Sequence, residues 1–222
     1  MKKYPLRLTY TAKTALWAGN RLTAEWGKKG ESDRISETWE LSVRPREMAE
    51  ILNGEGKGMT LEAYFAACGA DCVSPAYRLG DRFPLLVKLI DAADSLSVQV
   101  HPDDAYAARV EGDSGKTEMW YIVEAEEGAS LVYGLKKNFD EAAFRAALAE
   151  GKVEELLNYV PVHKGDVFFI PQGLVHAIGK GILIAEIQEN SNVTYRVYDY
   201  GRLQNGKPRD IRTKEILCPH LY

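Results

Sequence analysis

The chain has no long apolar run and few cysteines, and each shortage excludes a class of protein. No stretch of its 222 residues approaches the ~20 apolar residues that span a bilayer. Lys2 and Lys3 are not followed by the apolar segment of a signal peptide. Cys68, Cys72 and Cys218 lack the spacing of a zinc finger and fit free thiols in a reducing compartment. We therefore expect a cytoplasmic protein with no membrane partner.

Basic residues are outnumbered by acidic ones, and this balance bears on the kind of partner the chain can bind. The chain carries 28 lysines and arginines against 32 aspartates and glutamates, a formal net charge of −4. This balance argues against a nucleic-acid-binding surface. A hydrophobic content of 45% and a charged content of 27% are typical of a soluble globular protein. We expect a single domain over residues 1–222, of undetermined oligomeric state.

Many short stretches of alternating or continuous apolar residues predict a mainly β protein. The run 85–90 is predicted to be buried on both faces except for Lys88. Few helices among many short strands favour a β-sandwich or a small barrel, and a small closed barrel can hold one ligand inside. The expected strands are 37–43, 85–90, 96–101, 115–123, 129–133, 167–170, 182–188 and 193–199.

Helical excursions are expected between some of these strands. Thr60 can cap the first of them, and Gly69 suits its C-terminal end. Asn138, followed three residues later by Glu141, is a capping box that opens the last. The excursions are expected at about 58–69, 102–112 and 138–158.

Three of the predicted strands carry side chains that can bind a metal. Alternate residues of a strand share a face, so Gln99 and His101 lie together. Glu118 lies on a second strand, and His176 follows a Pro-Gly corner after a third. These strands could bring an amide oxygen, two imidazoles and a carboxylate into one pocket. That set of groups is the outline of a metal site.

The metal and one of its ligands stay open on these residues alone. Taken singly, His101 and His176 would be core or surface histidines, and their place in a four-group set is what indicates ligands. Nitrogen and oxygen donors suit Zn²⁺, and they suit Fe²⁺, Mn²⁺ or Co²⁺ nearly as well. Gln99 is a weak, neutral donor that could instead hydrogen-bond to a ligand. Glu118 is predicted to be buried, and a buried carboxylate needs a metal, a cation or a hydrogen-bonding network.

Four motifs, in one order along the chain, resemble a known family. The stretch 165–176 fits the second cupin motif, Gly-x5-Pro-x-Gly-x2-His. The motifs are Gln-Val-His-Pro-Asp-Asp at 99–104, Gly-Lys-Thr-Glu-Met-Trp-Tyr at 115–121, Pro-Gln-Gly-Leu-Val-His-Ala-Ile at 171–178 and Glu-Ile-Gln-Glu-Asn-Ser-Asn-Val-Thr-Tyr-Arg-Val-Tyr-Asp at 186–199. Together they resemble the type I mannose-6-phosphate isomerases, especially the short bacterial form, from about Leu8 to the C-terminus.

The resemblance implies a cupin-type β-barrel, or jelly roll, that holds one Zn²⁺ per chain. It implies that Arg196 is the catalytic arginine and that Lys116, Glu186 and Ser97 lie in a sugar-phosphate pocket. Ile178 stands where the longer forms carry a tyrosine, a change that the short forms share. The family's usual C-terminal β-domain is expected to be absent. The implied zinc ligands are Gln99, His101, Glu118 and His176.

The implied pocket residues also have plainer readings. Arg196 could pair with Glu186 to hold the barrel together, although its guanidinium presents a fork of donors to an anion. Lys116 could be a surface lysine, but it shares a face with Glu118 and should reach the same cavity. A nearby metal would lower the pKa of this lysine and suit it to proton transfer. Ser97 could be an ordinary strand residue or a phosphate contact.

The main hypothesis is therefore a metal-dependent aldose–ketose isomerase that interconverts mannose 6-phosphate and fructose 6-phosphate through a cis-enediol. Its base stays open among Lys116, Glu186 and a metal-bound water. The alternative is a non-catalytic, metal-containing cupin that binds a sugar or sugar phosphate. An iron-dependent cupin dioxygenase also fits the ligands, but it leaves Arg196, Lys116 and Glu186 without a role.

Overall fold

The computed structural model of the chain describes residues 3–69, 72–78, 80–136 and 141–212, and these are mainly strands. The strands are β1 (Thr11–Lys13), β2 (Glu37–Leu41), β3 (Leu85–Ala92), β4 (Val98–Val100), β5 (Glu118–Ala125), β6 (Ser130–Leu135), β7 (Leu157–Pro161), β8 (Val167–Ile170), β9 (His176–Ala177), β10 (Ile182–Glu189), β11 (Tyr195–Tyr198), β12 (Leu203–Gln204) and β13 (Lys207–Pro208). The helices are α1 (Arg21–Ala24), α2 (Leu61–Cys68), α3 (Asp104–Val110), α4 (Glu141–Glu150) and the 3₁₀ helix η2 (Val153–Leu156).

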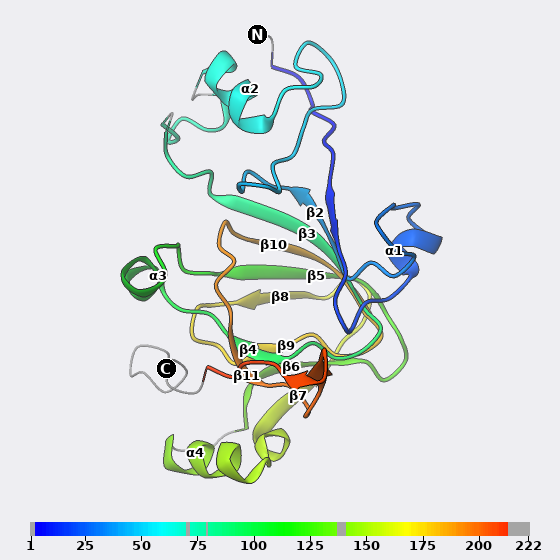
Figure 1. The fold of residues 1–222 in the computed structure, drawn as a ribbon, viewed down its shortest axis with the longest axis vertical. Coiled ribbons are helices and arrows are strands. Elements are labelled where there is room, and N and C mark those ends of the chain that lie inside the picture. The colour runs from blue at the N-terminus through cyan, green and yellow to red at the C-terminus, as the bar shows by residue number, and fades with distance from the viewer. Residues whose placement is uncertain (1–2, 70–71, 79, 137–140, 213–222) are drawn as a thin grey trace.

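Two antiparallel sheets form the body of the molecule (Figure 1). One has the strand order β1-β2-β3-β10-β5-β8 and the other β11-β4-β9-β6-β7, with β12 and β13 as a separate hairpin. The main core lies between the two sheets: Ile90 and Ile122 from the first pack with Leu131 and Ile178 on the side of the second. This arrangement confirms the prediction of a mainly β, cupin-like fold with short helical excursions.

Helices α2, α3, α4 and η2 lie where the sequence predicts helical excursions, and their caps explain three of the boundaries. Thr60 accepts a hydrogen bond from the Ala63 amide at 3.2 Å, and Gly69 ends α2 with a φ of 95°. Asp103 caps α3 by accepting from the Tyr106 amide at 2.7 Å. The predicted capping box at 138–141 begins outside the described residues.

The short elements α1, β1, β7, β9, β12 and β13 are absent from the prediction, because none carries a periodic pattern long enough to stand out. All the predicted strands are present, 167–170 with the predicted ends and the others with ends shifted by a few residues. No helix in the described ranges is long and apolar enough to cross a membrane.

The prediction that Lys88 escapes burial is wrong. Its strand, β3, lies inside the six-stranded sheet between β2 and β10, and the lysine is only 5% exposed. A buried ammonium is tolerated where it is paired, and Lys88 Nζ lies 2.9 Å from Glu186 Oε1. The residues next to Lys88 in the sequence predict an exposed lysine, whereas its ion-pair partner Glu186 lies on a strand almost 100 positions later in the chain.

Candidate metal centre

The first sheet carries a row of polar side chains across three neighbouring strands. Antiparallel register places Lys88 of β3 opposite Glu186 of β10, and Glu186 opposite Trp120 of β5. Directly opposed residues of adjacent strands point to the same face of a sheet. Two positions along the ladder, Glu118 pairs with Gln188 and extends the polar surface. All five side chains are buried.

The second sheet carries a matching row. Its register places Arg196 of β11 opposite Gln99 of β4, and Gln99 opposite His176 of β9. The rings of His176 and Trp120 lie 5.4 Å apart in an edge-to-face arrangement, so the two rows meet there. Strand pairing within each sheet and the packing of the two sheets together gather residues that are widely separated in the sequence.

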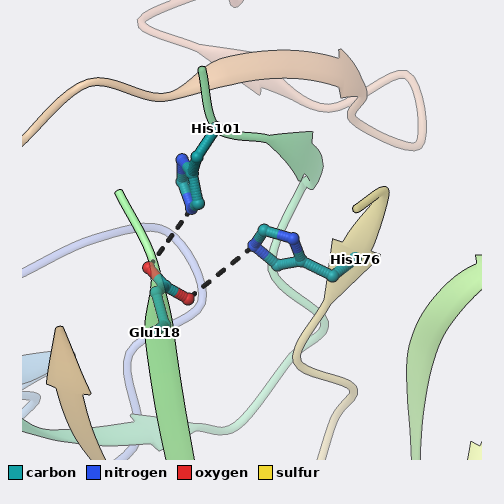
Figure 2. A group of neighbouring side chains, drawn as sticks. All are labelled: His101, Glu118 and His176. Atoms are coloured by element: carbon teal, nitrogen blue, oxygen red, sulfur yellow. Dashed lines mark ion pairs between the residues drawn. The ribbon is translucent and has the colours of Figure 1, made fainter. Parts of the chain in front are cut away.

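A cluster of two imidazoles and one carboxylate lies where the rows meet (Figure 2). His101 Nε2 is 3.2 Å from Glu118 Oε1, and His176 Nε2 is 3.8 Å from Glu118 Oε2. His101 and His176 are 0% exposed and Glu118 is 1% exposed. One potential ligand atom from each residue lies within 4.8 Å of the other two.

Hydrogen bonds fix the orientation of both imidazoles. His101 Nδ1 donates to the Val193 carbonyl at 2.9 Å, and His176 Nδ1 donates to the Leu174 carbonyl at 2.9 Å. A carbonyl oxygen only accepts, so the proton of each neutral ring sits on Nδ1 and the Nε2 lone pair faces the centre of the cluster. This is the usual arrangement of a metal-binding histidine.

Burial keeps these rings neutral, and the charge of Lys116 keeps the carboxylate ionised. Burial, with Lys116 adding to it, lowers the pKa of His101 to about 4, and burial also lowers the pKa of His176. Burial alone would raise the pKa of Glu118, but Lys116 and the imidazoles outweigh it and hold that pKa well below its ordinary value. The cluster thus offers two lone pairs and one negative charge near neutral pH.

The donor set fits a divalent metal. Lys116 Nζ lies 2.5 Å from Glu118 Oε1 and 3.3 Å from His101 Nε2, so a positive charge is already accommodated beside these atoms. Ligands bound at about 2.1 Å from one ion lie roughly 3–4 Å apart, close to the spacing of the cluster. Two imidazole nitrogens with carboxylate oxygen suit Zn²⁺ and other first-row divalent ions.

Gln99, the predicted fourth ligand, contacts the cluster by its amide. The amide nitrogen as assigned is 3.3 Å from His176 Nε2, where it can donate to the ring lone pair. Rotating the Gln99 amide by half a turn would exchange its nitrogen and oxygen, and the oxygen would then face the cluster. Its role as a ligand stays a prediction.

A cavity of about 270 Å³ opens beside the cluster. This is near the lower end of the ~300–1,000 Å³ typical of small-molecule sites. Lys116 lines the cavity and also touches Glu118, so it connects the two. The polar lining consists of Glu37, Lys88, Ser97, Gln99, Lys116, Glu186, Asn192, Thr194, Arg196 and Arg209.

Lys88 and Glu186 form a second buried ion pair in the cavity wall. Lys88 Nζ is also 3.6 Å from Glu37 Oε2 and lies 5.3 Å from the centre of the Trp39 ring. Burial would lower the pKa of Lys88, but Glu186 and Glu37 outweigh it and raise that pKa above its ordinary value. The lysine therefore stays an ammonium across the physiological range.

Two guanidinium groups, those of Arg196 and Arg209, also line the cavity. Arg196 Nη1 donates to the Asp210 carbonyl at 2.9 Å, and the arginine forms no ion pair with any carboxylate in the described part of the chain. Burial, helped by Arg209, lowers its pKa, although a guanidinium stays charged. Arg209, in contrast, is held by Asp199 through Nε at 2.6 Å.

The predicted site residues all lie around this cavity or the adjoining cluster. Ser97, Gln99, Lys116, Glu186 and Arg196 line the cavity. The predicted ligands His101, Glu118 and His176 form the cluster behind Lys116. Their chemical roles stay predictions.

The predicted site residues do not include several polar residues of this region: Glu37, Lys88, Trp120, Asn192, Thr194 and Arg209. Trp120 lies two positions after Glu118 on the same face of β5, and that spacing could have revealed it. Lys88 and Arg209 carry no local signal, because their neighbours in space come from distant strands.

The chain matches the sequence profile of the family described as "Phosphomannose isomerase type I, catalytic domain" over residues 6–142. It is 41% identical over 214 residues to a protein named mannose-6-phosphate isomerase from Streptococcus mutans, covering 96% of this chain and 66% of that one. The chain thus spans about two thirds of the length of this relative.

Solved structures agree with the profile. A crystal structure of the mannose 6-phosphate isomerase from Bacillus subtilis superposes with a TM-score of 0.88 at 37% identity, covering 97% of this chain and 69% of that one. A zinc-bound mannose 6-phosphate isomerase shares the fold at 17% identity, with a TM-score of 0.67, covering 96% of this chain and 73% of that one. The profile match alone extends over more than half of the sequence, and the chain belongs to the type I phosphomannose isomerases.

Proposed function

We propose that the chain catalyses the interconversion of mannose 6-phosphate and fructose 6-phosphate, with a divalent metal held by His101, Glu118 and His176. The observation that carries this proposal is the buried cluster of two neutral imidazoles and one carboxylate beside a cavity with cationic walls. Membership of the family supports the choice of substrate. Zinc, one ion per chain with Gln99 as a further ligand, is the metal we propose first.

The charges of the cavity suit a sugar phosphate. Four cationic side chains line it, against the two carboxylates Glu37 and Glu186. Among the described residues, the buried Nε of Arg196 has no hydrogen-bond partner and no carboxylate pairs with its guanidinium. A guanidinium in that state can bind an anionic oxygen with little competition. The cationic residues of the lining are Lys88, Lys116, Arg196 and Arg209.

The isomerisation moves one proton from C2 to C1 and one from O2 to O1, and it needs no external oxidant. A base removes the proton from C2 of the open-chain aldose and O1 gains a proton, which gives the cis-enediol. Return of a proton at C1 and loss of the proton on O2 then give the ketose. A metal bound at the cluster supplies Lewis-acid stabilisation of the negative charge that develops on the sugar oxygens. Arg196 adds a second positive group at the same charge. Lys116 and Glu186 remain the two side chains proposed for the proton transfer, and both line the cavity.

The test is the formation of fructose 6-phosphate from mannose 6-phosphate by the purified chain, before chelation, after chelation and after zinc is restored. We expect turnover that chelation abolishes and zinc recovers. A folded, fully metallated chain without turnover would overturn the proposal and favour a cupin that binds a sugar phosphate without converting it. Recovery with iron or manganese but not zinc would overturn the choice of metal.

The role of Arg196 has its own prediction. Arg196→Ala should keep the metal content of the wild type while kcat falls by at least roughly 100-fold, the loss expected when one donor to a developing oxyanion is removed. Arg109→Ala, which alters an exposed arginine on α3, serves as the matched control. Near-normal turnover by Arg196→Ala would exclude this role.

A further inference from the structure

Trp120 connects the proposed metal centre to the second ion pair of the cavity. Its indole is 0% exposed, on β5 between β10 and β8 of the six-stranded sheet. The single N–H of this indole donates to Glu118 Oε2 at 3.0 Å and to Glu186 Oε2 at 3.0 Å. One donor therefore serves two buried carboxylates that come from different strands.

The two oxygens of Glu118 consequently have different partners. Oε1 faces Lys116 at 2.5 Å and His101 at 3.2 Å, whereas Oε2 accepts from the indole. The same indole packs edge-to-face against the ring of His176 at 5.4 Å. Trp120 thus touches two of the three residues of the cluster, and it defines the direction in which the carboxylate faces.

The Trp120 side chain does more than fill space in the core. An apolar ring of the same size would pack equally well against the neighbouring isoleucines, but it would leave both Oε2 atoms without their donor. Two carboxylates that approach one point repel each other unless a donor or a cation lies between them. The lysines, Lys116 and Lys88, contact the other oxygens, and the indole N–H is the group between the two glutamates.

We propose that Trp120 is a positioning residue that orients Glu118 for metal binding and holds Glu186 at a set distance from it. This inference rests on the proposed metal site, and it adds a residue that is not one of the proposed ligands. Hydrogen-bonding partners of metal ligands commonly contribute 10–100-fold to metal affinity. Loss of the indole N–H should have an effect of that size.

The experiment compares Trp120→Phe with Trp39→Phe as a matched control. Trp39 is also buried, at 4% exposed, and its N–H also donates to a glutamate, Glu37 Oε2, at 3.0 Å. Glu37 does not belong to the cluster, so the control removes a similar ring and a similar hydrogen bond elsewhere. Each chain is stripped of metal, and its affinity for Zn²⁺ is measured by competition with a chromophoric chelator.

We expect about a 10–100-fold loss of Zn²⁺ affinity in Trp120→Phe and a change below about threefold in Trp39→Phe. The visible absorption of bound Co²⁺ reports ligand geometry, and it should shift in Trp120→Phe alone. Equal losses in the two variants, or an unchanged affinity and spectrum in Trp120→Phe, would overturn the inference.

A second variant covers the case in which Trp120→Phe fails to fold. Replacing Trp120 alone by 3-benzothienylalanine keeps the size of the ring and substitutes sulfur for the N–H. The same loss of affinity and the same spectral shift are expected, and wild-type behaviour would overturn the inference. A wild-type chain that binds no Zn²⁺ at the cluster would instead refute the metal site itself, so the two failures are distinguishable.

Discussion

Two buried lysine–glutamate pairs lie beside the cavity, and the side chains around each pair differ. Lys116 and Glu118 lie 2.5 Å apart beside two imidazoles whose lone pairs face inward. Lys88 and Glu186 lie 2.9 Å apart beside a second carboxylate, Glu37, with the lysine 5.3 Å from an aromatic ring. The first environment supplies electron pairs to a cation, whereas the second holds an ammonium in place.

The difference shows that the ion pair itself does not decide the chemistry. Both pairs are almost completely buried, and Trp120 donates to the glutamate of each. Neutral histidines make Glu118 part of a metal-binding set, since imidazole is a ligand only when its nitrogen carries a lone pair. In the described part of the chain Glu186 forms no ion pair with a histidine and keeps a lysine partner, which favours a structural or proton-transfer role.

The largest expected effect comes from breaking the second pair. Lys88→Met should destabilise the fold by about 3–5 kcal/mol, because it leaves Glu186 charged and buried without its cation. The double variant Lys88→Met/Glu186→Leu should be closer to the wild type, since it removes both charges. Urea denaturation at neutral pH measures both free energies of unfolding. A double variant less stable than Lys88→Met would contradict this account.

A somewhat smaller effect should appear when the metal-free chain is acidified. His101 has a pKa of about 4 in the fold against 6.5 when unfolded. The unfolded chain therefore binds more protons below pH 6.5, and stability is lost as the pH falls from 6.5 toward 4. The loss should reach roughly 3 kcal/mol at pH 4 from this residue. Urea denaturation across this range should show a shallower dependence for His101→Asn; an identical slope would refute the assignment.

The third comparison removes one charge from each pair. Glu118→Gln should weaken Zn²⁺ binding by about 100-fold, or about 2.8 kcal/mol, because a neutral amide replaces the charged ligand. Glu186→Gln should change the affinity by less than about threefold, because that side chain is not in the cluster. Titration against a competing chelator measures both. Equal losses would show that the two glutamates do not play separate roles.

Much of the site was predictable because its residues lie in local patterns. Gln99 and His101 alternate on one short strand, and His176 follows a recognisable Pro-Gly corner, so residue type and spacing indicated ligands. The approach of His101 and His176 to within 4 Å of Glu118 follows from the packing of one sheet against the other, since Glu118 lies on β5 and the histidines on the side of β4 and β9. The role of each side chain in that pocket stays a prediction.

Lys88 shows where such reasoning fails. Within its own strand it is a polar residue in an apolar run, which predicts an exposed side chain. Its actual environment depends on the strands beside β3 and on their register, which sets Glu186 directly opposite. A shift of one residue would turn every side chain of the strand to the other face. No local pattern contains that information.

By itself the sequence determined the fold class, the helical excursions and the candidate ligands, because alternation, capping residues and donor types are properties of neighbours in the chain. Only the tertiary structure decided that Lys88 is buried, that Trp120 serves two carboxylates and that Arg196 has no carboxylate partner among the described residues. Those facts depend on the order and register of strands from distant parts of the chain, which the packing of the two sheets selects.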